Sequence, residues 1–201
     1  MRKLVLILVA ASAEAQECSP ASVLVVLDKS SSMTFTIDGI PKWDLAVDAL
    51  ATVVDAYGDS VEFGLMMFPD PSECSAGSVQ VDVGPDTASA ILDALAAPPP
   101  ASGNYTPMSQ SLDVAADYAP LLAAAKPHVL LITDGWQWCD PYDGSTRFWP
   151  VGSVETLSDL GVVTHVVGFG DGVDVLTLNM MAEAAGTSVP DCDATSSDPA
   201  G

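Results

Sequence analysis

Oxygen-bearing side chains follow two apolar runs of this chain, at the point where each run ends. Asp28, Ser30 and Ser32 come directly after the run 23–27, and Asp134 follows a second run. Apolar runs without polar alternation are typical of strands buried on both faces of a parallel sheet. The carboxyl ends of such strands are where α/β proteins bind ligands. Carboxylates and hydroxyls, with no histidine or thiolate among them, suit a hard divalent cation such as Mg²⁺.

A threonine completes the pattern. Thr106 lies in the segment 103–108, between the D-x-S-x-S loop 28–32 and Asp134. This order of loop, threonine and aspartate resembles the von Willebrand factor type A (vWA) family, whose signature is called the metal-ion-dependent adhesion site (MIDAS). The D-x-S-x-S loop alone would be a weak signal, but five matched positions in one order are specific. The resemblance covers about residues 20–185 and implies a Rossmann-like α/β fold of three layers, with a mainly parallel sheet and one antiparallel edge strand.

The resemblance also implies a role for each residue of the signature. Ser30 and Ser32 would bind the cation directly, and Thr106 would bind it directly or through water. Asp28 and Asp134 would hold it mainly through bound waters. Because hydroxyl ligands are neutral and Mg²⁺ seldom sits in an all-protein cage, one position would stay open for the Asp or Glu carboxylate of a protein partner. The choice among Mg²⁺, Mn²⁺ and Ca²⁺ stays open.

Each signature residue also has a local explanation. The serines could form an ordinary polar loop, Thr106 could cap a helix that begins at Pro107, and Asp134 could belong to a turn. These explanations require five coincidences at one end of a sheet, so we favour a single cation site. A structural or scaffold subunit with an idle site is the alternative function, and a metal-dependent hydrolase or phosphotransferase ranks below it.

Enzyme signatures are missing from the sequence. A phosphotransferase of the haloacid dehalogenase type would need an acid at the position of Ser30. Neither the G-x-G-x-x-G fingerprint of a nucleotide-binding strand–helix turn nor the G-x-S-x-G elbow of a serine hydrolase occurs. We therefore expect a binding module for adhesion or protein–protein interaction, and not an enzyme.

Aromatic residues are concentrated close to this signature. Trp136, Trp138 and Tyr142 follow Asp134, and Tyr105 precedes Thr106. Aromatic residues dominate the energetic centres of protein interfaces, so these four could form a ligand-binding rim around the cation. Alternatively, they pack a long loop onto the helices.

Four widely spaced cysteines lack any C-x-x-C motif, and the chain has only two histidines, which argues against zinc. In a secreted protein, disulfides are the default. Three pairings are possible. We expect Cys74–Cys139 to join two loops and Cys18–Cys192 to join the two ends, although Cys192 could have a partner in a longer chain.

The N-terminus has the zones of a secretory signal. Arg2 and Lys3 precede an apolar stretch and then small residues, which predicts a signal peptide over residues 1–15 and a secreted, cell-surface or periplasmic protein. The stretch is shorter than the roughly 20 residues that span a bilayer, so we expect no transmembrane segment. The alternative is a buried N-terminal element.

A formal net charge of −21 disfavours nucleic acid and anionic lipid as partners.

The domain is predicted over residues 16–187, followed by a polar acidic tail over 188–201. Helical periodicity indicates helices over 43–57, 86–97, 107–125, 151–160 and 174–185, and apolar runs indicate strands over 23–27, 61–68, 79–83, 129–133 and 162–167. We expect strand 79–83 to be the half-exposed edge strand and strand 162–167 to be buried. The family continues with another strand and helix, so we expect a sheet without these last two elements, or a shortened version of a longer chain.

Overall fold

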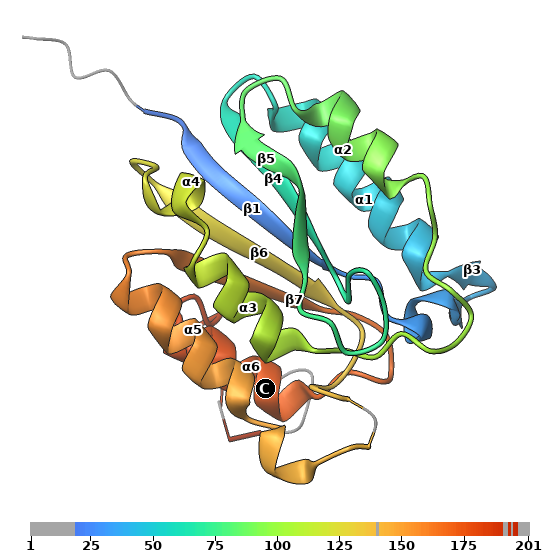
Figure 1. Ribbon diagram of the computed structural model, residues 1–201. Helices are drawn as coiled ribbons and strands as arrows, with labels where there is room; N and C mark the ends of the chain where they lie inside the picture. Colours follow the sequence, from blue (N-terminus) through green and yellow to red (C-terminus); the bar gives the residue numbers. More distant parts are fainter. Residues whose placement is uncertain (1–18, 140, 191–192, 194, 197–201) are drawn as a thin grey trace, which may run out of the picture.

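A five-stranded sheet forms the centre of the molecule (Figure 1). The computed structural model describes residues 19–139, 141–190, 193 and 195–196, so the predicted signal peptide and the predicted Cys18–Cys192 bridge lie outside the described residues. In spatial order the strands are β5 (Ser78–Gly84), β4 (Val61–Phe68), β1 (Ala21–Asp28), β6 (Pro127–Thr133) and β7 (Val163–Gly168). Every pair is parallel except β4 with β5, which confirms the predicted antiparallel edge strand.

Helices cover both faces of this sheet (Figure 1). One layer contains α1 (Lys42–Tyr57) and α2 (Ala88–Leu95); the other contains α3 (Met108–Ala116), α4 (Ala119–Leu122), α5 (Trp149–Asp159) and α6 (Val175–Ala184). The loop after β1 holds a short 3₁₀ turn, η1 (Ser31–Thr34), and a small hairpin of β2 (Thr36–Ile37) and β3 (Ile40–Pro41); a second turn, η2 (Gly144–Thr146), precedes α5. Among the described residues, no helix is long and apolar enough to cross a membrane.

Strand β1 is buried on both faces, as its unbroken apolar sequence predicts. Leu24 and Val26 belong to the core beneath α3, α5 and α6. Val25 and Leu27 belong to the core beneath α1 and α2. Successive side chains of a strand point to opposite faces, so this one strand contributes to both cores and fixes their relative position.

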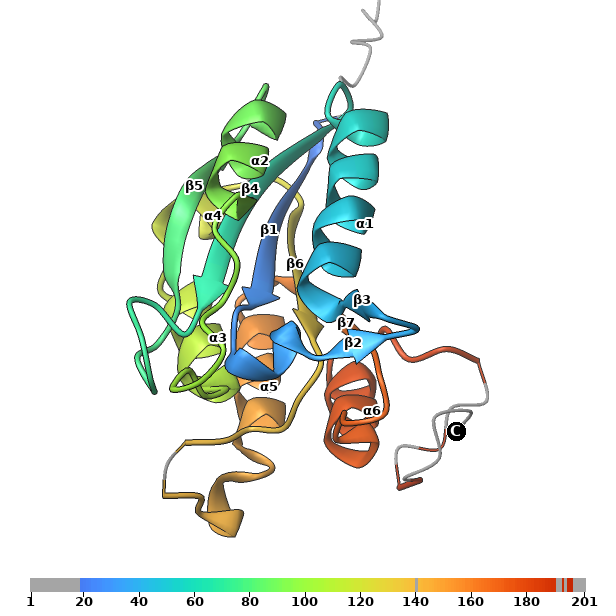
Figure 2. The ribbon, with the colours of Figure 1, turned by 90° about the vertical axis from the view of Figure 1, so that its right-hand side faces the viewer.

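The strand order reverses between β1 and β6. The chain passes from β1 through α1 to β4 on one side, and later enters β6 on the other side of β1. The parallel register pairs Leu27 with Ile132, so Asp28 and Thr133 come next to each other at the carboxyl ends. Figure 2 shows these ends at the lower edge of the sheet, close to the loop that follows β1. This is the place where α/β folds bind ligands.

Two sequence predictions were wrong in detail. The helix expected over residues 107–125 is two helices, α3 and α4, because Pro120 lacks an N–H and its ring would clash with the carbonyl of Ala116, where α3 ends. Strand β7, expected to be buried, leaves Val163 38% and Val167 45% exposed. The helices α5 and α6 cover only the face that carries Val166.

A close approach between β4 and β5 provides a test of this packing. A Cβ atom at Gly64 would lie 2.6 Å from Val83 Cγ2 and 2.8 Å from the Val83 backbone nitrogen. We expect Gly64→Ala to lower the free energy of unfolding by about 1–3 kcal/mol, measured by urea denaturation. The control is Gly152→Ala in α5, where a Cβ would meet nothing within 4 Å and helix propensity should raise stability slightly. Equal stabilities of the two variants would contradict the packing.

Candidate functional site

Asp28 is the last residue of β1 and its carboxylate is held from two sides. The Thr133 hydroxyl donates a hydrogen bond of 2.6 Å to Oδ2, and the Ser30 backbone N–H donates one of 2.8 Å to Oδ1. The side chain is completely buried. Because both partners come from residues next to the strand ends, the parallel pairing of β1 with β6 itself fixes the position of this carboxylate.

A chain of hydroxyls connects this loop to Asp134. The hydroxyls of Ser30 and Ser32 lie 2.9 Å apart, and Ser32 Oγ donates a hydrogen bond of 2.8 Å to Asp134 Oδ1. The turn η1 presents these serines, and its buried residue Met33 anchors the turn in the core. A hydroxyl that donates a hydrogen bond to a carboxylate still has lone pairs that could bind a cation.

Thr106 reaches the same place from a third segment. Its backbone forms two hydrogen bonds with Trp138, of 2.9 and 3.0 Å. A Cβ atom built on Gly135 would lie 3.4 Å from Thr106 Oγ1 and 4.0 Å from Asp28 Oδ2, so both oxygens flank the backbone of Gly135. The hydroxyl does not cap α3, whose N-cap residue is Pro107.

The structure thus brings together all five residues of the predicted signature, from three loops. Their donor set consists of three hydroxyls and two carboxylates. Among the described residues, no group of three or more His, Cys, Asp or Glu could hold a metal ion. A cation at this site would therefore need the hydroxyls as well as the acids. This composition fits a hard divalent cation bound by oxygen.

The environment of Asp28 disfavours its charged form. Burial raises the pKa of this carboxyl most, the neighbouring charge of Asp134 raises it too, and the hydrogen bonds from Thr133 and Ser30 lower it, so that the pKa stands at about 7. A divalent cation would favour the ionised carboxylate, because metal binding and proton release are coupled.

A lysine that the sequence analysis did not single out completes the site. Lys42 is the first residue of α1 and only 7% exposed, and its Nζ lies 2.7 Å from Asp134 Oδ2. A basic residue at a helix N-terminus opposes the helix dipole, and this mismatch is the sequence signal that could have identified it. Thr133 was missed too, because it belongs to the apolar run of its strand.

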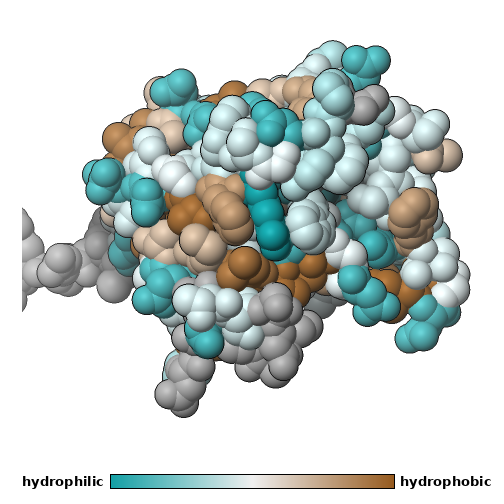
Figure 3. Space-filling view, turned by 90° about the horizontal axis from the view of Figure 1, so that it is seen from below, coloured by the Kyte–Doolittle hydropathy of each residue, from teal (hydrophilic) through white to brown (hydrophobic). Residues whose placement is uncertain are grey.

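A cavity of about 450 Å³ opens above these residues. Its wall includes the four aromatic residues predicted as a rim, together with a fifth, Phe35, that was not predicted: Phe35, Tyr105, Trp136, Trp138 and Tyr142. The rings of Trp138 and Tyr142 stack at 4.2 Å between centroids. Figure 3 views the molecule from this end and shows hydrophobic surface next to hydrophilic surface around a hollow.

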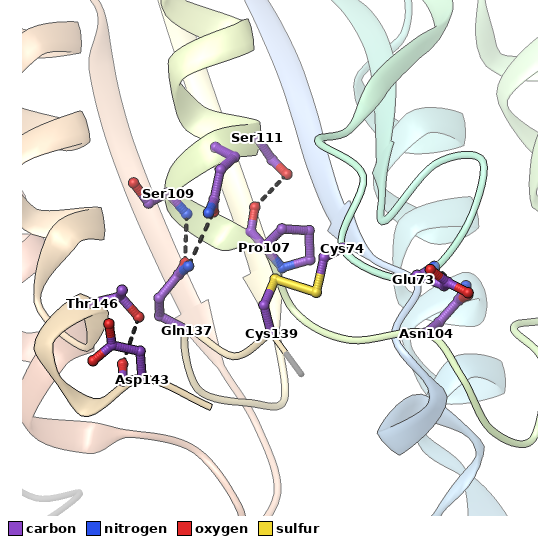
Figure 4. The surroundings of a disulfide bond; sticks show 11 residues. Glu73, Cys74, Asn104, Pro107, Ser109, Ser111, Gln137, Cys139, Asp143 and Thr146 are labelled. Atoms are coloured by element: carbon purple, nitrogen blue, oxygen red, sulfur yellow. Dashed lines mark hydrogen bonds between the residues drawn. A yellow bond between two sulfur atoms is a disulfide. The ribbon is translucent and has the colours of Figure 1, made fainter. Parts of the chain in front are cut away.

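The aromatic loop is fixed by covalent and polar contacts (Figure 4). The disulfide Cys74–Cys139 is present, as predicted, and joins the loop after β4 to the loop after β6. Between these cysteines and α3, the buried Gln137 accepts a hydrogen bond of 2.8 Å from the Ser109 N–H. The loop is therefore held in place before any ligand arrives.

An ion pair attaches the far end of this loop to α6. The guanidinium of Arg147 donates two hydrogen bonds of 2.7 Å to Asp174, the N-cap residue of α6. The same guanidinium lies 4.5 Å above the ring of Trp136. Although burial raises the pKa of Asp174, the hydrogen bonds from Arg147 and Thr177 lower it more, and the net shift is downward.

The chain belongs to the von Willebrand factor type A family: the family model described as "von Willebrand factor type A domain" matches residues 22–198. No curated protein matches the chain. The family match and the mixed five-stranded sheet together confirm the fold that the signature predicts.

Solved structures share this fold at low identity. Proximal thread matrix protein 1 from the mussel byssus, in a structure with a zinc-occupied MIDAS motif, is 19% identical, with a TM-score of 0.62 over 87% of this chain and 44% of that chain. The PilB minor pilin from Streptococcus sanguinis is 12% identical, with a TM-score of 0.61 over 88% and 56%. The pilus adhesin SpaC from Lactobacillus rhamnosus GG is 18% identical, with a TM-score of 0.56 over 76% and 25%. This chain spans less than two thirds of the length of each.

The raised pKa of Asp28 predicts a pH dependence of stability without cations. The folded protein keeps this proton up to a pH of about 7, whereas the unfolded chain releases it near its ordinary value of 3.8. In this window the unfolded state binds fewer protons, so stability should fall as pH rises. Urea denaturation in chelator should show that wild type loses stability relative to Asp28→Asn as the pH rises from 3.8 to about 7. A constant difference across the window would contradict the prediction, and the exposed Asp113→Asn serves as control.

Proposed function

We propose that this chain is a secreted or cell-surface vWA module that binds a protein ligand through a divalent cation. One observation carries the proposal: the hydroxyl-bearing residues Ser30, Ser32 and Thr106 and the acid Asp134 line one cavity at the carboxyl ends of β1 and β6. The buried carboxylate of Asp28 adjoins them and accepts a hydrogen bond from the Ser30 backbone N–H. The bound cation would supply a Lewis-acidic position for an anionic group of the ligand. Asp28, Ser30, Ser32, Thr106 and Asp134 would hold it.

The arrangement of polar contacts supports this assignment. Ser32 donates a hydrogen bond to Asp134, and Asp28 accepts hydrogen bonds from Thr133 and Ser30, so both carboxylates already have protein partners. Carboxylates engaged in this way would contact a cation mainly through water, while the serine hydroxyls would bind it directly through their lone pairs. Neutral hydroxyls as direct ligands leave most of the positive charge available to a partner's Asp or Glu carboxylate.

The cavity wall supports a ligand that presents more than a carboxylate. Aromatic side chains surround the polar floor, and Trp136, Trp138 and Tyr142 are partly exposed. Such rings contribute strongly to binding when a partner covers them. We therefore propose that the ligand places an acidic side chain on the cation and an apolar neighbour against the rim.

The related structures support adhesion or assembly as the setting. They include a matrix protein of the mussel byssus, a minor pilin and a pilus adhesin. A scaffold role with an idle cation site is the second candidate, because a matrix protein and a pilin are themselves parts of assemblies. The zinc-occupied motif of the mussel protein places Zn²⁺ beside Mg²⁺, Mn²⁺ and Ca²⁺ among the cations to be tested.

Cation binding separates these two candidates. Isothermal titration of the wild type with each of the four cations should give one site per chain. Asp28→Ala should weaken this binding at least about 100-fold, since it removes a buried carboxylate at the centre of the site. The control, Asp113→Ala on the exposed face of α3, removes the same charge and should bind like wild type. Equal affinities of both variants would refute the site.

The rim can be tested with peptides selected from a display library in the presence of Mg²⁺. We expect the selected peptides to contain Asp or Glu and to be released by EDTA. Trp138→Ala should weaken their binding by about 1–3 kcal/mol without lowering the melting temperature, because the contacts of Trp138 with Thr106 are made by its backbone.

Trp149→Ala is the matched control for the rim. Trp149 begins α5, is more exposed than Trp138 and does not line the cavity. Its replacement should leave peptide binding unchanged. Peptides without acidic residues, or binding that persists in EDTA, would overturn the proposed role of the cation. A lower melting temperature of Trp138→Ala would show that the ring packs the loop.

A further inference from the structure

Lys42 is held firmly against the cation site. Its backbone N–H donates a hydrogen bond of 2.8 Å to the carbonyl of Phe35. Farther along the side chain, a Cβ atom at Gly170 would lie 3.0 Å from Lys42 Cε and 3.3 Å from Nζ. Gly170 has φ +84°, a backbone conformation that favours glycine, and the absence of a Cβ atom leaves room for the Lys42 side chain. The ammonium therefore has a built position and is not a mobile surface charge.

The two carboxylates of the site differ in whether their negative charge has a positively charged partner. Asp134 accepts hydrogen bonds from Ser32 on one oxygen and from the Lys42 ammonium on the other. The partners of Asp28 are the hydroxyl of Thr133 and the amide of Ser30, which are neutral. A buried charge is costly without a partner of opposite charge, so Lys42 compensates Asp134 whether or not a cation is present.

This compensation would also affect a bound cation, because Lys42 lines the same cavity as four of the predicted ligands, namely Ser30, Ser32, Thr106 and Asp134. Two carboxylates can offset the charge of a divalent ion, and an ammonium beside one of them restores a positive charge to the site. Opposite and like charges at such distances interact strongly where burial limits screening. The ammonium should therefore repel the cation and attract an anion.

We infer that Lys42 is a positioning residue that neutralises Asp134, lowers the affinity of the site for divalent cations and makes the loaded site more attractive to an anionic ligand. This inference rests on the proposed cation site. It matters in this chain because the net charge of −21 would otherwise repel the carboxylate of a ligand. Lys42 is one of only six Lys and Arg residues in the chain, and it lies in the wall of the cavity that the anionic ligand would enter.

Replacement of Lys42 by methionine keeps an unbranched side chain and removes the charge. In chelator, Lys42→Met should have a lower melting temperature than wild type, because Asp134 loses its countercharge. Titration with Mg²⁺ alone should show binding about tenfold tighter than in wild type. Saturating Mg²⁺ should therefore raise the melting temperature of the variant more than that of wild type.

Lys126→Met is the matched control, since Lys126 is exposed just before β6, at the opposite end of the sheet from the site. It removes the same charge and should leave both the Mg²⁺ affinity and the thermal shift as in wild type. If Lys42→Met does not fold in chelator, Lys42→Gln carries the same comparison, because glutamine keeps a hydrogen-bond donor for Asp134.

The outcomes distinguish this inference from the proposed function. Mg²⁺ binding by wild type that is unchanged or weakened in Lys42→Met would overturn the role of Lys42 and leave the cation site standing. Tighter binding in both Lys42→Met and Lys126→Met would show a general charge effect and would also overturn it. Absence of binding in wild type and in Lys42→Met would remove the proposed function, and the inference with it.

Discussion

Two carboxylates are buried side by side at the carboxyl ends of adjacent parallel strands, and the rest of the site follows from this constraint. Asp28 ends β1 and Asp134 follows β6, and the pairing of these strands leaves no freedom to separate them. Buried charges are tolerated only with partners. The surrounding loops supply them as hydroxyls, a backbone amide and an ammonium, each from a residue near a strand or helix end.

The loops that supply these groups are themselves fixed. The loop after β1 forms the turn η1, the segment of Thr106 pairs with the backbone of Trp138, and the disulfide Cys74–Cys139 joins two loops of the same end. A site that is already ordered requires little conformational entropy to be lost when a ligand binds. The energy of new contacts can then contribute to affinity. A covalent bond close to the aromatic wall is consistent with recognition on a rigid surface.

Sequence reasoning identified those residues of the candidate site that belong to a sequence pattern. The D-x-S-x-S loop, the threonine and the second aspartate stand in a fixed order, and apolar runs locate the strands that carry them. Lys42 and Thr133 have no such pattern, because their roles depend on contacts between distant segments. The division of the helix over 107–125 was missed for another reason. The helical spacing of apolar residues continues across Pro120, although a proline at this position prevents the helix itself from continuing. Strand β7 has an apolar sequence, but burial depends on which elements cover it.

At this cavity, the positions of a few charged side chains would affect ligand binding more than the net charge of the chain does. The acidic surface disfavours anionic partners at a distance, yet the wall of the cavity includes the Lys42 ammonium, which is paired with Asp134. Long-range repulsion is screened beyond about 10 Å at ordinary ionic strength, whereas contacts within a buried site are screened much less. Under the proposed function, a ligand at the aromatic wall would therefore respond to the local charge balance of the site more than to the net charge of the chain. Under the proposed function, selectivity would depend on shape as well as charge, because a ligand would have to cover the wall to bring its carboxylate within reach of the floor.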